Sequence, residues 1–168
     1  MARAFSASDP VDGRLTRWVG PASLAVAFAA LAAWGWRKWP DVQIDFWNQL
    51  SLPSQLPRGR ALYRDIDYGE GPLSLYANAA LFELFGASLR TLIFANLALL
   101  AALTALVYTL IARACGAFTA TVCCLVLLVV FGFSQYGDIG NYNYITPYTH
   151  DQTHGLLLGV VAVGCLAR

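Results

Sequence analysis

The stretch TLIFANLALLAALTALVYTLIA, residues 91–112, decides the class of fold. It places 22 uncharged residues between Arg90 and Arg113, and about 20 such residues are enough to cross a bilayer. Its seven Leu, two Ile, one Phe and one Val contribute roughly −3 to −7 kcal/mol on insertion scales. That gain outweighs the cost of Asn96 and three threonines, so the stretch predicts a membrane-spanning helix.

The composition of the whole chain agrees with this prediction. Of 168 residues, 58% are hydrophobic and 12% are charged, against roughly 45–50% and 25% in a typical globular chain. The formal net charge of +1 creates no field that would recruit nucleic acid. The apolar content also excludes a disordered polar tail. The four cysteines lie in or beside apolar runs and are interpreted as small apolar residues. The chain is therefore predicted to be an integral membrane protein.

Three further apolar runs complete an all-α, polytopic membrane fold. Residues 18–36 form an Ala-rich run with 19 uncharged residues, and residues 115–135 belong to a run of 24. Residues 155–168 hold only 13 uncharged residues before Arg168. With 89–112 as the secure span, we expect about three full spans and a partial fourth, as in a truncated protein.

The first of these runs has a second interpretation. A basic leader followed by an Ala-rich segment is also typical of a secretory signal peptide. Trp34, Trp36 and Trp39 beside Arg37 and Lys38 instead favour an interfacial aromatic belt, which a cleaved peptide does not need. We therefore expect a membrane anchor.

The order of the spans places both long polar loops on one side of the membrane. These loops cover residues 37–88 and 136–154, and two spans separate them. The leader, residues 1–17, is dense in basic residues, and the first span usually dominates orientation, so a cytoplasmic N terminus is predicted. Both loops then face away from the cytoplasm.

The first loop begins with two carboxylates in a helix-compatible pattern. Asp41 and Asp45 are four residues apart, and they share one face if Pro40 opens a helix. Phe46 and Trp47 give the same segment an apolar side, as in a helix at the membrane surface. We therefore expect short juxtamembrane helices in this loop, with Asp45 or Asp41 as a candidate base.

Charges of both signs follow in the same loop. Guanidinium groups bind phosphate oxygens and stabilise a departing phosphate, while a carboxylate can act as base for a hydroxyl. This combination suits transfer of a sugar from a lipid phosphate, whose leaving group needs no general acid. The alternative is a solvated loop whose charges neutralise one another. The candidates for phosphate binding are Arg58, Arg60 and Arg64, interleaved with Asp65, Asp67 and Glu70.

The second loop carries YGDIGNYNYITPYTHDQTHG, residues 136–155. Tyr148 and Asn143 are candidate sugar contacts, although tyrosines are also common at membrane interfaces. His150 and His154 fall on one helical face beside Asp151, a spacing compatible with a divalent metal ion. The string HDQTH also fits a zincin pattern with Asp in place of Glu, a remote alternative. Histidines that merely cap the fourth span are a further alternative.

The order of motifs resembles the start of the GT-C superfamily of glycosyltransferases that use lipid-phosphosugar donors. The most similar group contains the protein mannosyltransferases and aminoarabinose transferases. In that group an Asp follows the first span, then come a Gly, an LYRD-like string, a GPL or PPL turn and an FG ending. The resemblance covers about residues 40–155. The matching positions are Asp45, Gly59, Leu62 to Asp65, Gly71 to Leu73, and Phe85 with Gly86.

The resemblance implies roles for particular residues. It assigns the catalytic base to Asp45, with Asp41 as the rival, and it matches Asp151 to an acidic residue that positions the donor or a metal. Two features depart from the group. Ile44 stands where many relatives have a second acidic residue, and Glu70 and Gly71 stand where some carry a Lys that contacts phosphate.

The function implied is that of an inverting glycosyltransferase of a bacterial plasma membrane. It would move a sugar from a polyprenyl-phosphate donor to an extracytoplasmic glycan, lipid or protein, with a divalent metal ion as an optional cofactor. This chain would be its N-terminal part, inactive alone. A transporter or flippase-like protein and a non-catalytic membrane scaffold are the competing hypotheses. Transporters place ionisable residues near the middle of their spans, and the secure spans here have none.

Overall fold

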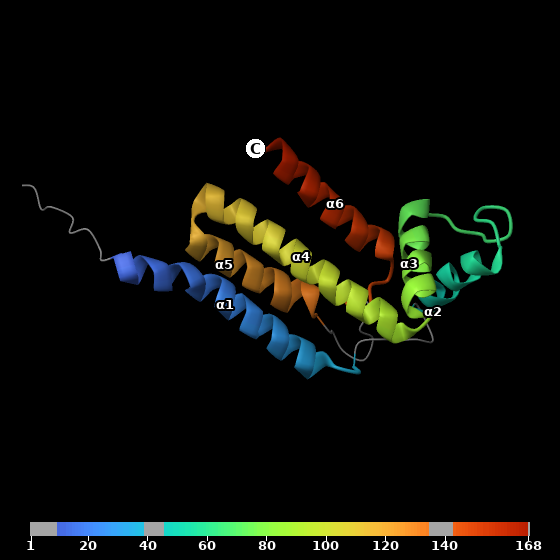
Figure 1. The fold of residues 1–168 in the computed structure, drawn as a ribbon, viewed down its shortest axis with the longest axis horizontal. Helices are drawn as coiled ribbons and strands as arrows, with labels where there is room; N and C mark the ends of the chain where they lie inside the picture. The colour runs from blue at the N-terminus through green and yellow to red at the C-terminus, as the bar shows by residue number, and fades with distance from the viewer. Residues whose placement is uncertain (1–9, 39–45, 135–142, 168) are drawn as a thin grey trace, which may run out of the picture.

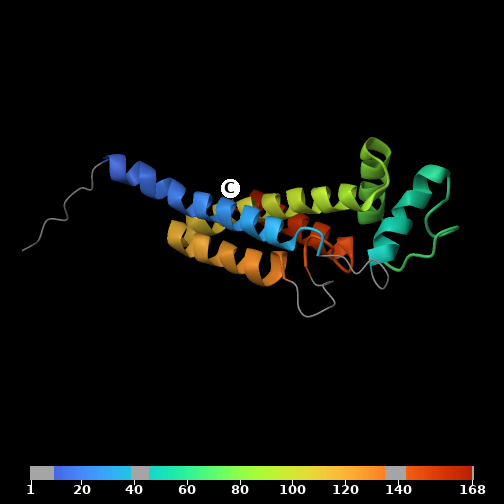
Figure 2. The same ribbon diagram turned by 90° about the horizontal axis from the view of Figure 1, so that it is seen from below.

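The chain is all-helical in a computed structural model that describes residues 10–38, 46–134 and 143–167. Within those ranges the only β-type pairing is an isolated bridge between Leu62 and Ile66. Helices α1, α4, α5 and α6 lie side by side as a bundle, and a group of shorter helices covers one end of that bundle (Figures 1 and 2). The predicted all-α class is therefore confirmed.

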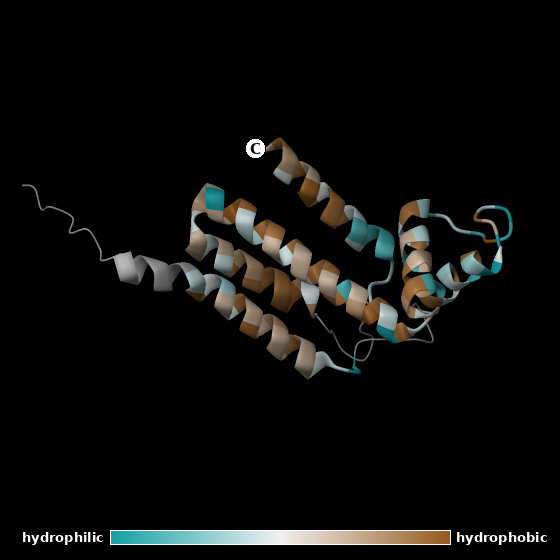
Figure 3. Cartoon of the chain, in the orientation of Figure 1, coloured by the Kyte–Doolittle hydropathy of each residue, from teal (hydrophilic) through white to brown (hydrophobic). Residues whose placement is uncertain are grey.

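Two helices are long and apolar enough to cross a membrane. The first is α1, Pro10–Gly35, with its apolar window at Trp18–Gly35, and the second is α4, Leu89–Cys115. At 1.5 Å per residue, the 27 residues of α4 extend about 40 Å. Hydrophobic residues predominate along α4 and along the Trp18–Gly35 window of α1 (Figure 3). These are the candidate spans in the described part of the chain.

The predicted third span is shorter in the structure. Gly116, with φ of 90°, ends α4 and leads directly into α5, Ala117–Val126. The α-helix then widens into a π-helix, η2, Leu127–Gly132. These 16 residues fall short of the roughly 20 that a full crossing needs. A complete third span and a partial fourth therefore stay predictions.

Two helix boundaries differ from the sequence-based ones. Helix α1 begins at Pro10 rather than near residue 18, so part of the predicted leader is helical. Helix α6, His150–Leu166, begins five residues before the apolar run does. The Thr149 side chain accepts a hydrogen bond from the backbone N–H of Asp151, and such an N-cap lets a helix begin on polar residues.

The core lies where α1, α4 and α5 pack together. Leu100 and Leu128 are fully buried there, and Phe28 meets Phe133 edge to face at 5.1 Å between ring centroids. A side-chain carbon at Gly132 would lie 2.9 Å from the Leu100 side chain, so η2 packs on α4 at a glycine. This close packing holds α1, α4 and α5 with η2 together.

Short helices of the first loop form a platform at one end of the rods. They are α2, Phe46–Ser51, the 3-10 helix η1, Pro53–Arg58, and α3, Pro72–Phe85. Pro72 starts α3, and Gly86, with φ of 85°, ends it before α4 turns away (Figure 1). Phe46, Phe82 and Leu92 form a small core that joins α2 and α3 to α4. The platform is thus fixed on the end of the bundle.

Candidate functional site

The two polar loops meet at the platform, as the span order predicts. Four pairs of side chains join them across about 80 to 100 residues of sequence. The imidazole Nδ1 of His150 lies 2.7 Å from Gln49 Oε1, and that of His154 lies 2.9 Å from Ser74 Oγ. The other two pairs are Tyr68 with Asp151 and Thr149 with Glu70. The polar first turn of α6 faces α3 across this junction (Figure 3).

His150 is the buried centre of the junction. Its Nε2 lies 3.0 Å from Asn96 Nδ2, and the same amide donates to the carbonyl of Ile145 at 2.9 Å. Because the Gln49 Oε1 atom only accepts, Nδ1 carries the proton and Nε2 accepts from Asn96. Burial, and then the nearby His154, lower the pKa of His150 to about 3. The ring is therefore a neutral imidazole with both nitrogens satisfied.

This arrangement does not fit a metal held by His150 and His154. Both ring nitrogens of His150 are engaged, Nδ1–H as a donor to Gln49 and the Nε2 lone pair as an acceptor from Asn96, and a ligating imidazole must offer a free nitrogen. Among the described residues, no three His, Cys, Asp or Glu side chains are grouped to hold a metal ion. The zincin-like pattern HDQTH meets the same obstacle, so no metal-dependent step is assigned to these histidines.

Two carboxyl groups come together beside the histidine. The Tyr68 hydroxyl donates to Asp151 and lies 3.4 Å from Glu70, and the Thr149 hydroxyl donates to Glu70. A hydrogen bond with Asp151, and then burial, raise the pKa of Glu70. Burial would raise the pKa of Asp151, but hydrogen bonds from Glu70 and Tyr68 outweigh it and lower that pKa. Of the two carboxyl groups, Glu70 is thus protonated more readily and Asp151 less readily.

The carboxyl pair borders an open polar cleft of about 470 Å³. Glu70 lines it directly, and Asp151 reaches it through the Tyr68 hydroxyl. Tyr148, which is half exposed, supplies an aromatic face on the same cleft. Carboxylates, amides and an aromatic ring in one cleft suit a hydroxylated ligand such as a sugar. The lining residues are Asn48, Gln49, Leu52, Asp67, Tyr68, Gly69, Glu70 and Tyr148.

Asn143, the other predicted sugar contact, stabilises the backbone of the second loop. Its side chain is buried, and its Oδ1 accepts the backbone N–H groups of Ile145 and Thr146 at 2.9 and 2.8 Å. Such a bond shapes an Asx turn. Asn143 shares a smaller cavity of about 200 Å³ with Tyr148. It therefore positions the second loop and does not line the carboxyl cleft.

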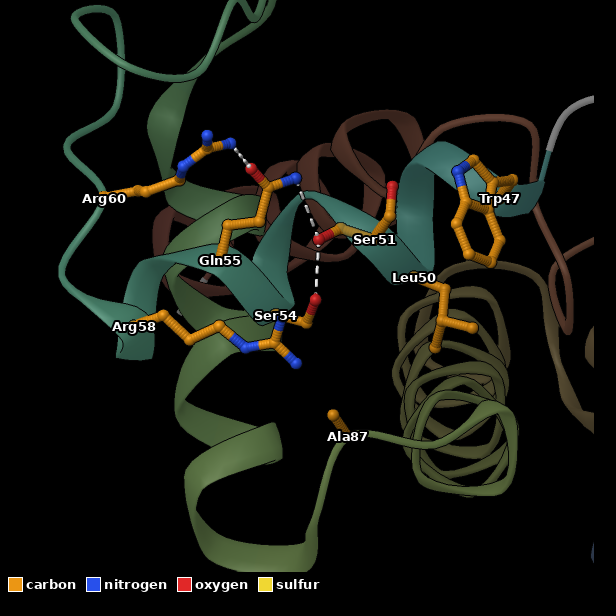
Figure 4. A pocket seen from close by; sticks show the side chains of 8 residues that line it. All are labelled: Trp47, Leu50, Ser51, Ser54, Gln55, Arg58, Arg60 and Ala87. Carbon is orange, nitrogen blue, oxygen red and sulfur yellow. Dashed lines mark hydrogen bonds between the residues drawn. The ribbon is translucent and has the colours of Figure 1, made fainter.

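The three arginines of the first loop are not brought to the carboxyl cleft. Arg58 and Arg60 line another pocket, beside Trp47 and Leu50 (Figure 4). Arg64 instead pairs with Asp65, with 2.8 Å between Nη2 and Oδ2. Arg64 lines neither cavity.

The arginine pocket and the carboxyl cleft lie on opposite sides of α2. Successive residues of an α-helix are about 100° apart. Trp47, Leu50 and Ser51 face the pocket, whereas Asn48, Gln49 and Leu52 face the cleft, so the two faces are roughly 150° apart. A phosphate held by both arginines would therefore have α2 between it and the carboxyl pair.

Asp45 and Asp41 lie outside the described residues. Phe46, the next residue, is buried and packs against His150 with 5.9 Å between ring centroids. The start of α2 is therefore at the junction of the loops. The catalytic roles of Asp45 and Asp41 stay predictions.

Sequence reasoning did not single out the partners that complete the junction. Asn96 offered a signal, because an amide inside an apolar span seeks a partner. Gln49 and Tyr68 offered none, since their partners are distant in sequence. In the sequence Glu70 stands out as one charge among several and as a departure from the Lys of some relatives, and neither feature points to Asp151.

Comparisons with known proteins add no relative. No protein-family model matches the chain, and no curated protein and no solved structure matches it significantly. The fold and the junction therefore define the class directly: an all-helical protein with two candidate membrane spans and a polar site at one end of its bundle.

Proposed function

We propose that this chain is part of a membrane glycosyltransferase that moves a sugar from a polyprenyl-phosphate donor to an extracytoplasmic acceptor. One observation carries the proposal: Glu70 and Asp151, from two separate loops, meet at the border of a polar cleft at the end of an apolar bundle. A reaction between a lipid-anchored donor and a water-soluble or lipid acceptor requires such a site at a membrane surface. The motif order that resembles the GT-C superfamily supports the same activity.

The carboxyl pair supplies the base that this reaction needs. Asp151, with its lowered pKa, is ionised at neutral pH and can accept the proton of an acceptor hydroxyl. The acceptor oxygen then bonds to the anomeric carbon of the sugar, and the bond from that carbon to the lipid phosphate breaks. The lipid phosphate leaves with the electron pair, and inversion follows from a single displacement. Asp45 and Asp41 are the competing bases.

The charge of the cleft determines which part of the reaction it hosts. Asp67 lines it, and Asp151, whose pKa is lowered, is adjacent, so a phosphate is disfavoured inside it by like charge. An acceptor hydroxyl and the sugar ring face no such repulsion. In this proposal the phosphate departs away from the carboxyl pair, towards the membrane.

The proposal requires the cleft to face away from the cytoplasm. Three full spans and a partial fourth, with residues 1–17 in the cytoplasm, would place the cleft outside the plasma membrane of a bacterium. The transferase would contain further spans beyond those of this chain.

Substitution of the carboxyl pair tests the proposal. The assay measures transfer of radiolabelled sugar from a panel of polyprenyl-phosphate monosaccharides to endogenous acceptors, in membranes that contain the full-length protein. Asp151→Asn should reduce transfer about 100-fold or more, because general-base catalysis contributes about 10²–10⁴. Glu83→Gln is the matched control, since Glu83 is an exposed carboxylate of α3 away from the cleft.

Three outcomes separate the hypotheses. Loss of transfer in Asp151→Asn with full activity in Glu83→Gln supports the carboxyl pair. Full activity of Asp151→Asn together with loss in Asp45→Asn would return the base to the first loop. Absence of transfer from every donor in the unaltered protein would refute the transferase.

A further inference from the structure

A second pocket, separate from the carboxyl cleft, opens on the other side of α2. It has a volume of about 570 Å³ and lies between α2, η1 and the turn from α3 to α4 (Figure 4). Ala87, two residues before the start of α4, forms part of its wall. The pocket is therefore within about one helical turn of the end of a candidate membrane span. This is the depth at which lipid headgroups lie.

The pocket is positively charged and its cations are free to bind an anion. The guanidinium group of Arg58 has no hydrogen bond or ion pair with any described residue. Arg60 donates to Gln55 Oε1, a neutral amide, at 2.5 Å. Asp65 forms its ion pair with Arg64, whose hydrogen bond is the main cause of its lowered pKa, while the charge of Arg60 contributes least. Among the described residues that line the pocket, none is Asp or Glu.

The rest of the wall combines hydroxyl groups with an apolar side. Ser51 and Ser54 lie between the arginines and Trp47 (Figure 4). The Trp47 side chain is 57% exposed, and Leu50 lies next to it. Trp is the residue most suited to the headgroup layer, because its ring is apolar and its N–H is polar. A ligand that fills this pocket therefore needs an anionic head and an apolar body.

We propose that this pocket binds the phosphate of an anionic bilayer phospholipid, with its acyl chains running past Trp47 and Leu50 into the membrane. Guanidinium groups form paired hydrogen bonds with phosphate oxygens, and Arg58 and Arg60 can approach one headgroup from two sides. The bound lipid would hold η1 and α2 against the bilayer. The proposal is independent of the glycosyltransferase hypothesis, because it uses no residue of the carboxyl pair.

The donor phosphate is a poorer occupant of the same pocket. In a polyprenyl-phosphate sugar the phosphate is bonded directly to the reacting carbon, so the base must lie close to both. Helix α2 separates this pocket from Glu70 and Asp151. A bulk lipid has no such requirement.

Binding of short-chain lipids to the full chain in detergent tests this proposal. Short-chain phosphatidylglycerol, titrated and followed by calorimetry, should bind saturably. Phosphatidylcholine, whose headgroup has no net charge, should bind at least about tenfold more weakly than phosphatidylglycerol. The double variant Arg58→Gln/Arg60→Gln should weaken phosphatidylglycerol binding about tenfold or more, since each charge-assisted hydrogen bond is worth roughly that factor.

Arg64→Gln is the matched control, because it removes one positive charge from the same loop while the pocket stays intact. It should bind phosphatidylglycerol as tightly as the unaltered chain. Circular dichroism of the double variant checks that the helices persist. Arg58→Lys/Arg60→Lys keeps both charges but not the paired hydrogen bonds, so it should bind phosphatidylglycerol more tightly than the Gln variant and more weakly than the unaltered chain.

The other outcomes overturn the proposal. If Arg64→Gln weakened phosphatidylglycerol binding as much as the double variant does, the lipid would be held by the general positive charge of the surface and not by the pocket. Inorganic phosphate binding as tightly as phosphatidylglycerol would indicate a site for a free anion. Displacement of phosphatidylglycerol by an equimolar short polyprenyl phosphate would indicate a donor site.

Discussion

Replacing Asn96 by Ala should weaken the junction of the two loops more than any exposed substitution. Asn96 is 1% exposed, and its amide nitrogen donates to two buried acceptors, the carbonyl of Ile145 and Nε2 of His150. Both acceptor residues are 0% exposed. The alanine side chain offers neither hydrogen, and water has no access to replace it.

The expected loss follows from these two bonds. A buried acceptor left without a donor costs about 1–3 kcal/mol, while cross-helix hydrogen bonds in membrane proteins average only about 0.6 kcal/mol. Asn96 lies about 10 Å along α4 from its first residue. Its environment is therefore between a water-soluble protein core and the middle of a membrane. We expect Asn96→Ala to lower the free energy of unfolding by about 2–4 kcal/mol.

Unfolding of the full chain in mixed detergent micelles, titrated with a denaturing detergent, measures this difference. Thr109→Ala is the control on the same helix, because the Thr109 hydroxyl is exposed and bonds only to the Ala105 carbonyl of its own helix. It should change stability by about 0.5 kcal/mol or less. A loss in Asn96→Ala no larger than in this control would refute the buried network.

Two further predictions concern the pH dependence and the packing of the bundle. The pKa of His150 is lowered by burial from 6.5 to about 3, so the unfolded chain binds a proton below pH 6.5 that the folded chain does not. Stability should therefore fall by about 2 kcal/mol between pH 7 and pH 5, and His150→Gln should show a shallower fall; an equal slope in both chains would contradict the neutral ring. Gly20→Ala should cost about 1–3 kcal/mol, because the added carbon would lie 2.5 Å from Thr121 Oγ1. Gly159→Ala is the control, because the space around Gly159 is open, and it should be neutral or slightly stabilising. Equal melting temperatures for the two variants would argue against close packing of α1 on α5.

The fold was predictable where hydropathy alone determines it. The 22 uncharged residues before Arg113 specify α4 without ambiguity. The true start of α6 was missed because counting apolar residues passes over a polar first turn. Thr149 followed by Asp151 is nevertheless a recognisable helix start. The early start of α1 was missed because the charges of the leader obscure its helix.

The site was predictable as residue types and not as partnerships. The helical spacing of the second loop points to His150 with His154, and the resemblance to the GT-C group points to Asp151. Their partners Glu70 and Gln49 lie about 80 to 100 residues away, and only the packing of α2 and α3 on α4 brings them near. The arginines were assigned to one site with the acids because a linear loop gives no information about the two sides of α2.

The π-helix η2 sets which side of its own helix Gly132 and Phe133 occupy. In a π turn the backbone N–H of Phe133 bonds to the carbonyl of Leu128, five residues earlier, so the turn contains one residue more than an α turn. Gly132, rather than a bulkier neighbour, consequently faces Leu100. Deleting one residue from η2 would restore an α-helix but rotate the succeeding chain by about 100°. The backbone N–H of Tyr144 bonds to the carbonyl of Gly132, so the second loop inherits its angular setting from this single extra residue.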